Sequence, residues 1–411
     1  MVDCVPDGWV KKLFGEVVKK VNDKVDLETS DLSRYVAGEH MTSNDLKIRS
    51  WGTVGDGYLG PAFHMGFKPG HVLYGSRRTY LRKVALPHFE GICANTTFVL
   101  DTKDSGLMLQ EYLPLIMQLE RFHEFSELNS KGSVNPYVNF SDLAAYEFVL
   151  PPMDVQKRIV TIVEAVNDHL DALEKALEKI RIVRMRTLST LLTSPKENWT
   201  VKNLSELCEM RKGISYKSDE LANEGDGMPF INLKSVAIGG GYRSDGLKWY
   251  SGEYKETQIV QPGQLLICCT DITREKAVIG CPIRVPVDER YEDYCISLDL
   301  LALDVDEQIV HSDFLFLALQ ERRLRQFMQK NSRGTTVMHL RIKAVPNASI
   351  VLPPLSEQNR IVEEIELFDN LVGSLETRVE LVKELRQALL SDLLSGSREI
   401  PESFDELEMT V

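Results

Sequence analysis

One long segment occurs twice in this sequence of 411 residues. The 45 residues that begin at Leu150 align without a gap with the 45 that begin at Leu352, an offset of 202 residues, and 16 aligned positions are identical. The alignment extends upstream, where the stretch 129–133 matches the stretch 331–335. A long internal repeat indicates a chain built from two copies of one structural unit. Any fold must therefore accommodate the same segment twice.

Both copies of the repeated segment carry the pattern of a helix that pairs with another helix. Apolar residues recur at alternating steps of four and three, which is the a/d seam of a coiled coil sustained over about three heptads. Arg184 and Arg386 stand where the next seam residue is expected, and Leu191 and Leu393 resume the pattern. A Pro-Pro pair ends the preceding strand and starts each helix. The seam residues are Ile159, Val163, Val166, Leu170, Leu173, Leu177 and Ile180 in the first copy, and Ile361, Ile365, Phe368, Val372, Leu375, Val379 and Val382 in the second.

The order of segments along the chain predicts the topology. The second globular part lies between the two helices in sequence, so the helices run antiparallel if both join that part at the same end. Forty-odd helical residues span about 60 Å at roughly 1.5 Å each. The two globular parts would then lie at opposite ends of a rod. A coiled-coil spacer of unrelated purpose is the alternative interpretation.

We therefore expect an α+β protein, in which two α/β domains are separated by two long antiparallel coiled-coil helices in a pseudo-twofold internal repeat. The length supports this expectation, because 411 residues are too many for one compact core. The predicted boundaries are 1–149 for the first globular domain, 150–197 for the first helix, 198–351 for the second globular domain, 352–396 for the second helix and 397–411 for an acidic tail.

The formal net charge of −13 argues at first sight against a nucleic-acid partner, but the charges are unevenly placed. No Asp or Glu occurs from Gly57 to Phe89 or from Arg322 to Ser356, and both windows are rich in basic residues. Basic stretches interleaved with Ser, Thr, Asn and Tyr suit contacts with phosphates and base edges. A solvated basic face or an acidic protein partner is the alternative for either window. Because each copy of the repeat contains one such window, we favour DNA.

The residues that we expect to contact DNA are basic and polar side chains of these windows and of smaller loops. One smaller loop runs from Met210 to Lys217, and another is the glycine-rich loop before Arg243, for which a plain hairpin turn is the commoner meaning. The candidates are Lys68, Ser76, Arg77, Arg78, Thr79, Tyr80, Arg82, Lys83 and Lys131 in the first copy, and Arg211, Lys212, Tyr216, Arg243, Arg274, Lys276, Arg333, Thr335, Thr336, Arg341 and Lys343 in the second.

The sequence lacks the motifs of several enzyme classes. It has no GxxxxGK[ST] phosphate-binding loop, no HExxH motif, no Cys/His spacing typical of zinc and no GxSxG elbow. The Asp/Asn/Ser-Pro-Pro-aromatic tetrapeptide of amino-methyltransferases is also absent, and Asn135-Pro136-Tyr137 is the nearest string. We therefore predict a chain that has no catalytic centre and binds no metal.

The cysteines indicate the compartment. There are seven, none of them in a CxxC pair, and the adjacent Cys268 and Cys269 suit strand packing better than a metal site. We expect reduced thiols in a cytoplasm. The start of the chain does not have the pattern of a signal peptide, and no segment approaches the roughly 20 apolar residues that a membrane-spanning helix needs.

The chain resembles the specificity (S) subunit of type I restriction-modification systems over essentially its whole length. The most specific part of the resemblance is the LPP-x-x-x-Q-x-R-I-V start of both helices, at 150–160 and 352–362, and the N-S-[KR]-G-[ST] stretch before each helix supports it. The resemblance implies that the globular parts are target-recognition domains, each of which reads half of a bipartite, asymmetric DNA sequence. Because the two parts differ strongly in sequence, they would read different half-sites.

The resemblance also implies partners and a role in defence against foreign DNA. The antiparallel helices would fix the gap between the half-sites and dock two methyltransferase (modification) subunits, and restriction/translocase subunits would join them. S-adenosylmethionine, ATP and Mg²⁺ would be bound by these partner subunits and not by this chain. No membrane partner is implied.

Three alternatives stay open from the sequence. One is the recognition subunit of a type IIB-like enzyme, in which a single companion both methylates and cuts. Another is a self-contained DNA methyltransferase or nuclease, and the third is a scaffold whose coiled coil simply joins proteins. Neighbouring genes, assays of the pure chain and footprinting of a reconstituted complex would distinguish them.

Overall fold

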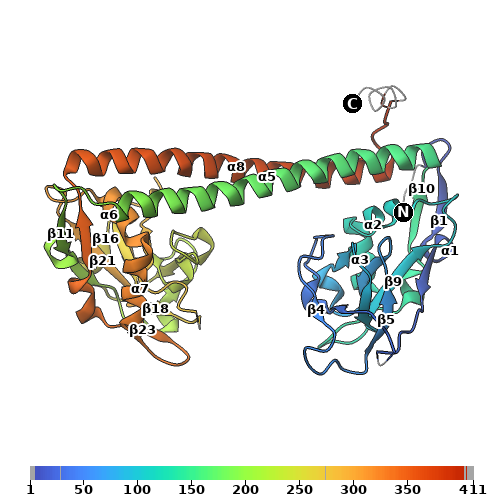
Figure 1. Cartoon of the computed structure of the whole chain (residues 1–411), viewed down its shortest axis with the longest axis horizontal. Coiled ribbons are helices and arrows are strands. Elements are labelled where there is room, and N and C mark those ends of the chain that lie inside the picture. Colours follow the sequence, from blue (N-terminus) through green and yellow to red (C-terminus); the bar gives the residue numbers. More distant parts are fainter. Residues whose placement is uncertain (1–4, 28, 274, 402–403, 405–411) are drawn as a thin grey trace. The chain divides into compact units, whose positions relative to one another are not determined.

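The computed structural model describes residues 5–27, 29–273, 275–401 and 404. Contacts divide the chain into two compact units, which we call unit 1 (Met1–Glu174 with Thr377–Val411) and unit 2 (Lys175–Glu376). Each unit contains one mixed α/β globular part together with half of each long helix (Figure 1). Among the described helices, none is long and apolar enough to cross a membrane.

The globular part of unit 1 is built around two four-stranded sheets. The first has the strand order β2-β9-β6-β7, formed by Val18–Val21, Thr97–Thr102, Val72–Gly75 and Val84–Ala85. The second has the order β4-β3-β8-β5, formed by Gly52–Thr53, Arg34–Val36, Gly91–Ala94 and Phe63–Phe67. In the second sheet β3 and β8 run parallel. Four short helices, α1 to α4, complete this part at Phe14–Val17, Leu113–Ile116, Glu120–Leu128 and Phe140–Leu143.

Unit 2 repeats this topology. Its four-stranded sheet has the order β12-β21-β17-β19, formed by Cys208–Lys212, Leu300–Val305, Leu265–Cys268 and Pro282–Arg284. Its five-stranded sheet has the order β13-β15-β14-β20-β16, formed by Leu221–Ala222, Lys248–Tyr250, Met228–Ile231, Tyr294–Ile296 and Ile259–Val260. Here β14 and β20 again run parallel. The order β15-β14-β20-β16 repeats β4-β3-β8-β5, and β13 is an additional edge strand. The matching orders confirm the internal repeat and the predicted α+β class.

Unit 2 also contains a small sheet with the order β18-β23-β22, formed by Thr270–Asp271, Met338–Leu340 and Ser332–Arg333. Two helices, α6 (Ser312–Gln320) and α7 (Arg322–Lys330), lie between β21 and β22 in the sequence. Helix α7 and β22 together contain most of the basic residues of the window in the second copy, namely Arg322, Arg323, Arg325, Lys330 and Arg333.

In each unit a two-stranded antiparallel ribbon leads into a long helix. In unit 1, β1 (Val10–Leu13) pairs with β10 (Glu147–Leu150). In unit 2, β11 (Thr200–Asn203) pairs with β24 (Ser349–Leu352). Both β10 and β24 end at the leucine of a Leu-Pro-Pro sequence, because proline cannot donate to the ladder and suits the first turn of a helix.

The two long helices are α5 (Met153–Thr193) and α8 (Leu355–Ser395). Within unit 2, Arg181 pairs with Glu376, and the Arg184 guanidinium contacts the Asp369 carboxylate at 3.0 Å. Rising residue numbers on α5 thus match falling numbers on α8. The predicted antiparallel pairing is confirmed.

The ends of both helices are built into the hydrophobic cores of the globular parts. In unit 1, Ile159 and Val163 of α5 and Leu393 of α8 belong to one buried cluster with Phe14 and Phe122. In unit 2 the corresponding cluster contains apolar residues of both helices together with sheet and helix residues of the globular part. Its members include Leu188 and Leu192 of α5, Ile361 and Ile365 of α8, Leu265, Leu303 and Phe314. Neither globular part therefore completes its core without both helices.

The seam beyond the interrupting arginines differs from the prediction on α5. Leu188 and Leu192 are buried there, whereas the predicted Leu191 is only partly buried. The core of unit 2, rather than the opposite helix alone, selects which leucines turn inward. On α8 the predicted Leu393 is buried, and so are Leu390 and Leu394.

Arg184 joins three segments of unit 2. Its guanidinium donates to both carboxylate oxygens of Asp369 on α8 and, at 3.1 Å, to the Gln320 amide oxygen at the end of α6. The seam is therefore interrupted by a polar cluster whose members satisfy one another. Such a cluster avoids the cost of an unpaired buried cation.

Arg386 occupies the equivalent place in unit 1, 202 residues later. It donates to the amide oxygens of Asn167 on α5 and of Gln118, which stand at the positions equivalent to Asp369 and Gln320. Burial lowers the pKa of Arg386. The same three-way contact thus recurs, with a neutral amide where unit 2 has a carboxylate.

The glutamine of the repeated LPP-x-x-x-Q motif fastens each helix to its globular part. In unit 1, Gln156 is 0% exposed, and its amide oxygen accepts the Leu109 backbone N–H at 2.9 Å. Its amide nitrogen donates to the carbonyl oxygens of Leu107 and Pro151, at 3.0 and 2.9 Å. A buried polar group has to be hydrogen-bonded, and here every partner is a backbone atom.

Unit 2 contains the same arrangement. The amide oxygen of Gln358, also 0% exposed, accepts the His311 N–H at 2.9 Å. Its nitrogen donates to the carbonyl oxygens of Ile309 and Pro353. These partners lie 202 residues after those of Gln156. The conserved spacing of the motif is therefore explained by one buried hydrogen-bonded contact that is made twice.

We predict that Gln358→Ala destabilises unit 2 by roughly 1–3 kcal/mol, because one buried N–H and two carbonyl oxygens lose their partner. Denaturant or thermal unfolding of the full chain measures the loss. Gln308→Ala, at an exposed position in the same unit, is the matched control and should change the unfolding free energy little. Equal effects of the two substitutions would contradict this role for Gln358.

Candidate nucleic-acid interface

A repeated Asn-Ser pair ends a helix in each unit. In unit 1 the Asn129 side chain donates to the Phe125 carbonyl at 2.8 Å, and the Ser130 hydroxyl donates to the Glu127 carbonyl at 2.7 Å. In unit 2, Asn331 and Ser332 make the equivalent contacts, at 2.9 and 2.6 Å, with carbonyls at the end of α7. These side chains add hydrogen bonds to carbonyls of the last helical turn, which backbone N–H groups of the cap residues also contact.

A hairpin follows each of these helix ends. In unit 1 the backbones of Lys131 and Tyr137 exchange hydrogen bonds of 2.7 and 2.9 Å. In unit 2, Arg333 of β22 pairs with His339 of β23. The glycine of the repeated motif starts the turn with positive φ, at +89° for Gly132. The motif therefore encodes a helix cap followed by a hairpin.

Gly334 begins the turn in unit 2, with φ at +136°. A Cβ atom there would overlap the carbonyl oxygen of Val337. No other residue fits this position without a backbone shift. We call the two elements hairpin 1 (131–137) and hairpin 2 (333–339).

The basic loop of unit 1 lies against hairpin 1. Arg77 forms a β-bridge with Tyr137, and its guanidinium lies 5.5 Å from the centre of the Tyr137 ring. The Arg78 N–H donates to the Pro136 carbonyl at 2.6 Å. In unit 2 the matching partner of hairpin 2 is β18, where Thr270 pairs with His339. Both units therefore place the segment after a central strand beside the hairpin.

Three basic residues in these loops have left-handed backbone conformations. The φ angles are 50° at Arg78, 49° at Arg82 and 56° at Lys276. Such a conformation costs about 1–2 kcal/mol for a residue with a Cβ atom. Strain of this kind persists where surrounding structure enforces it and is frequent at functional sites.

Buried groups hold the loop of unit 2 in place. The Asp271 carboxylate is 0% exposed and accepts backbone N–H groups of Thr273, Val278 and Ile279. Arg325 of α7 donates to the carbonyls of Ala277, at 2.9 Å, and Ile279. Burial lowers the pKa of Arg325. Arg325 belongs to the second basic window, but neither side chain is among the DNA contacts expected from the sequence, since only contacts with distant residues reveal their role.

Several predicted cations are already paired within their unit. The Arg82 guanidinium donates to the Glu120 carboxylate at 2.6 Å, and this contact raises the pKa of Arg82. The other pairs are Lys131 with Asp142 at 2.9 Å, Arg211 with Asp304 at 2.9 Å and Arg243 with Asp245 at 3.0 Å. Lys83 donates to the Gly38 carbonyl, and Lys276 donates to the Gln329 carbonyl at 3.0 Å.

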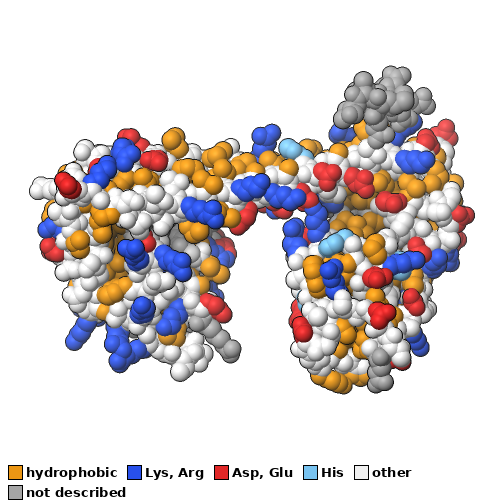
Figure 2. Space-filling view, in the orientation of Figure 1, with side chains coloured by type: hydrophobic (Ala, Val, Ile, Leu, Met, Phe, Trp, Pro, Cys, Tyr) orange, Lys and Arg blue, Asp and Glu red, His pale blue; other side chains and the backbone are white. Residues whose placement is uncertain are grey.

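Other predicted cations are exposed and form no ion pair with another described residue. They are Lys68, Arg77 and Arg78 in unit 1, and Lys212, Arg333, Arg341 and Lys343 in unit 2. Figure 2 shows Lys and Arg side chains gathered over the end of unit 2 that carries α7, β18 and β23 in Figure 1. These unpaired charges are the ones that can contact phosphates without first breaking an internal ion pair.

The polar candidates differ in exposure. Ser76 and Thr79 are buried, and the Ser76 hydroxyl donates to the Thr96 carbonyl at 2.6 Å. Tyr80 is exposed, and the partly buried Tyr216 packs edge-on against Phe230. Thr335 and Thr336 lie at the exposed tip of hairpin 2. Arg274 lies outside the described residues. DNA contact by each of the candidates stays a prediction.

The sequence did not single out the tip of hairpin 1. Ser133, Val134 and Asn135 are exposed there. Ser133 is the last residue of the N-S-[KR]-G-[ST] motif, and the other two residues follow the motif directly. The repeat itself is the available signal, because Thr335 and Thr336 at the equivalent tip are among the expected DNA contacts. No group of three or more His, Cys, Asp or Glu side chains within the described residues could hold a metal ion.

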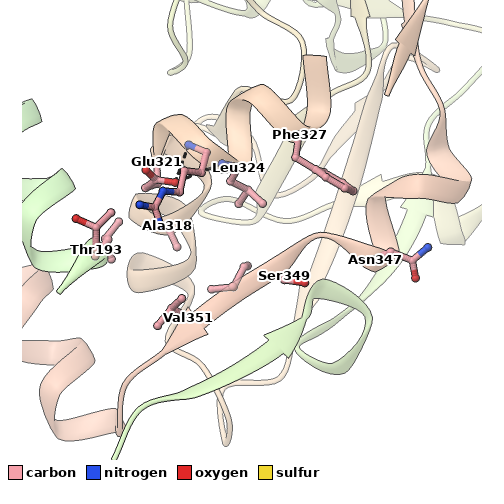
Figure 3. Close-up of a pocket in the computed structure, with 11 residues that line it drawn as sticks. Thr193, Ala318, Glu321, Leu324, Phe327, Asn347, Ser349 and Val351 are labelled. Atoms are coloured by element: carbon pink, nitrogen blue, oxygen red, sulfur yellow. Dashed lines mark hydrogen bonds between the residues drawn. The ribbon is translucent and has the colours of Figure 1, made fainter. Parts of the chain in front are cut away.

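A groove of about 220 Å³ in unit 2 lies away from these loops, between the end of α5, the α6–α7 corner and β24 (Figure 3). Its wall is mostly apolar, with Ala318, Leu324, Phe327 and Val351 among its residues. The Glu321 carboxylate beside it accepts the N–H groups of Arg323 and Leu324 and so caps α7. This groove contains no constellation of catalytic side chains.

Comparison with known proteins agrees with the repeat. The family model described as the type I restriction modification DNA specificity domain matches residues 6–181 and 196–384. The chain is 20% identical over 420 residues to the type I restriction enzyme MjaVIII specificity subunit of Methanocaldococcus jannaschii, covering 95% of this chain and 93% of that protein. It is 25% identical over 209 residues to the EcoBI specificity subunit of Escherichia coli, covering 50% of this chain and 40% of that protein.

Two solved structures share the fold. A chain from a structure of a type I restriction-modification system superposes with a TM-score of 0.62 at 23% identity, over 95% of this chain and 98% of that one. The type I restriction-modification S subunit from M. genitalium gives 0.54 at 13% identity, over 97% and 98%. Both likenesses extend over nearly the whole length of the chain.

We predict that the double substitution Arg77→Gln with Arg78→Gln weakens DNA binding by the full chain in its native assembly. The slope of log affinity against log salt should fall by about one for each lost phosphate contact. Arg82→Gln is the control, because Glu120 already holds that guanidinium. It should lower thermal stability and change the slope less than the double substitution does. An unaltered affinity and slope in the double variant would assign this loop to another role.

Proposed function

The chain belongs to the family of type I restriction modification DNA specificity proteins, and we propose that it is the DNA sequence-recognition subunit of a type I restriction-modification enzyme. Each unit reads one half of a bipartite, asymmetric target. The observation that carries this proposal is the recurrence, in both units, of a hairpin beside a segment that follows a central strand. Exposed basic side chains without an ion pair among the described residues lie at both hairpins, Arg77 and Arg78 in unit 1 and Arg333 and Arg341 in unit 2. Phosphate contacts by such side chains position a protein on DNA, and groove contacts specify the sequence.

The proposed partners are two methyltransferase subunits, which dock on the long helices, and restriction/translocase subunits. Exposed leucines on α8 support docking. Leu367, at 71% exposed, and Leu371 lie on the half in unit 2, and Leu381, at 58%, and Leu385 lie on the half in unit 1. Each pair is spaced i, i+4, so both members share one face of the helix. An exposed apolar helix face is typical of a protein interface.

The proposed division of labour leaves catalysis to the partners. S-adenosylmethionine, ATP and Mg²⁺ bind to the methyltransferase and restriction subunits, and this chain contributes sequence recognition. The missing motifs of nucleotide hydrolysis and methyl transfer support this division. A cytoplasmic location fits the thiols, because the described cysteines Cys93, Cys208, Cys268, Cys269, Cys281 and Cys295 are all buried and unpaired.

The direct test is to sequence the methylated bases of a host with and without this gene. We expect a bipartite methylated motif that disappears when the gene is deleted. The pure chain, incubated with S-adenosylmethionine and DNA, should transfer no methyl groups above a blank without protein. Methyl transfer by the pure chain would assign it catalysis, and an unchanged methylome would rule out the recognition role.

A second test concerns the gap between the half-sites. Both helices pass from one unit to the other at equivalent residues, Glu174 and Glu376. Inserting seven residues after each one keeps both seams in phase and lengthens both helices by about 10 Å at roughly 1.5 Å per residue. Base pairs rise about 3.4 Å each, so we expect a gap longer by about three base pairs with both half-sites unchanged.

The control for the insertions is seven residues in α5 alone. Because the ends of both helices belong to the hydrophobic cores, a single insertion puts the two helices out of register and should destabilise the chain. A paired-insertion variant that methylates sites with the original gap would show that the helices do not set the spacing.

A further inference from the structure

Hairpins 1 and 2 share their framework and differ at their tips. In both, an asparagine and a serine end the preceding helix, and a glycine with positive φ begins the turn. Lys131 pairs with Tyr137 across hairpin 1, and Arg333 pairs with His339 at the equivalent positions of hairpin 2. The tips themselves are Ser133-Val134-Asn135 in hairpin 1 and Thr335-Thr336-Val337 in hairpin 2. Two elements that share a framework and differ at their exposed tips are suited to the same task on two different targets.

The tip side chains are available for contact with another molecule. Val134 is 94% exposed, and Ser133 and Asn135 beside it are exposed as well. In hairpin 2 the tip residues Thr335 and Thr336 are also exposed. None of the polar tip side chains forms a hydrogen bond within the part of the chain that the structure describes. The exposed valine and its unpaired polar neighbours would suit a partner surface that offers both apolar contacts and hydrogen bonds.

The surroundings of the tips identify that partner as a phosphate-bearing duplex. Arg77 and Arg78 lie against hairpin 1, and neither forms an ion pair with another described residue. Arg333 lies in hairpin 2, and Arg341 follows it, both exposed and likewise without an ion pair among the described residues. The major groove of B-DNA admits a two-stranded β-ribbon, and cations at the base of such a ribbon would face the phosphates along the groove.

We propose that hairpins 1 and 2 enter the major groove and that their tips read the bases of the two half-sites. Ser133, Val134 and Asn135 specify one half, and Thr335 and Thr336 specify the other. Asparagine can bond bidentately to adenine, hydroxyl groups can bond to several base edges, and the methyl groups of Val and Thr can contact the thymine methyl. This inference rests on the proposed function, to which it adds the residues that determine the sequence.

The test uses two double variants of the full chain, each assembled with its methyltransferase subunits. Val134→Ala with Asn135→Ala should change or relax the motif in one half-site only. Thr335→Ala with Thr336→Ala should change the other half. The ratio of specific to non-specific affinity should fall by about 10- to 100-fold in each variant, as for the loss of one or two base contacts. The salt slope and the unfolding temperature should stay unchanged, because the lost groups are uncharged and exposed.

A matched control removes the same atoms elsewhere in unit 1. Val10→Ala with Asn22→Ala alters one valine and one asparagine at exposed positions outside the hairpin and the basic loop. This control should methylate the original motif with the original affinity ratio. It separates an effect of the tip from a general effect of truncation.

Three results would overturn the inference. If both tip variants keep the original motif and affinity ratio, the hairpins do not read bases, and the proposed function stands without them. If the variant in hairpin 1 alters both half-sites, its tip acts through the assembly and not by base contact. If the wild-type assembly methylates no bipartite motif, the proposed function fails, and the inference fails with it.

Discussion

Residues of both long helices form part of the hydrophobic core of each globular part of this protein. Ile159 and Leu393, which belong to different helices, are buried in the same cluster as Phe122. In unit 2, Leu192 and Ile361 take the same role beside Phe314. Apolar burial is the largest favourable term in folding, so each recognition part is stable only while the helix pair is intact. The position of the hairpins relative to the helices follows from this shared core.

The sequence predicted the helices and their pairing well, because an a/d period is a local signal that survives in one sequence. It did not predict which leucines turn inward near Thr193. Leu188 and Leu192 are buried there, whereas Leu191 is only partly buried, because the first two belong to the core of unit 2 with residues such as Leu265 and Phe314 and do not pack against α8 alone. The role of Gln156 could not be predicted from the sequence either, since its partners lie up to 49 residues away.

The basic windows predicted the region of the candidate interface but not which of its charges are free. Arg77, Arg78 and Arg82 are three arginines in one short stretch, and the sequence alone does not distinguish their environments. Arg82 is held by Glu120, 38 residues later, whereas Arg77 and Arg78 lie exposed against hairpin 1. Ion pairs between residues distant in sequence depend on the fold. Composition could therefore indicate which windows are basic, but not which basic residues within them are free to contact DNA.

The two glutamine contacts bear on how such a chain diversifies. Gln156 and Gln358 bond only to backbone atoms, which every residue type supplies in the same form, apart from the N–H that proline lacks. A recognition part can therefore accumulate side-chain changes, or be exchanged by recombination at the Leu-Pro-Pro boundary, and still be fastened to its helix in the same way. The attachment tolerates substitutions in the globular part because the glutamine contacts only the backbone there, whatever the side chains are. Evolvable specificity is thus compatible with an invariant scaffold.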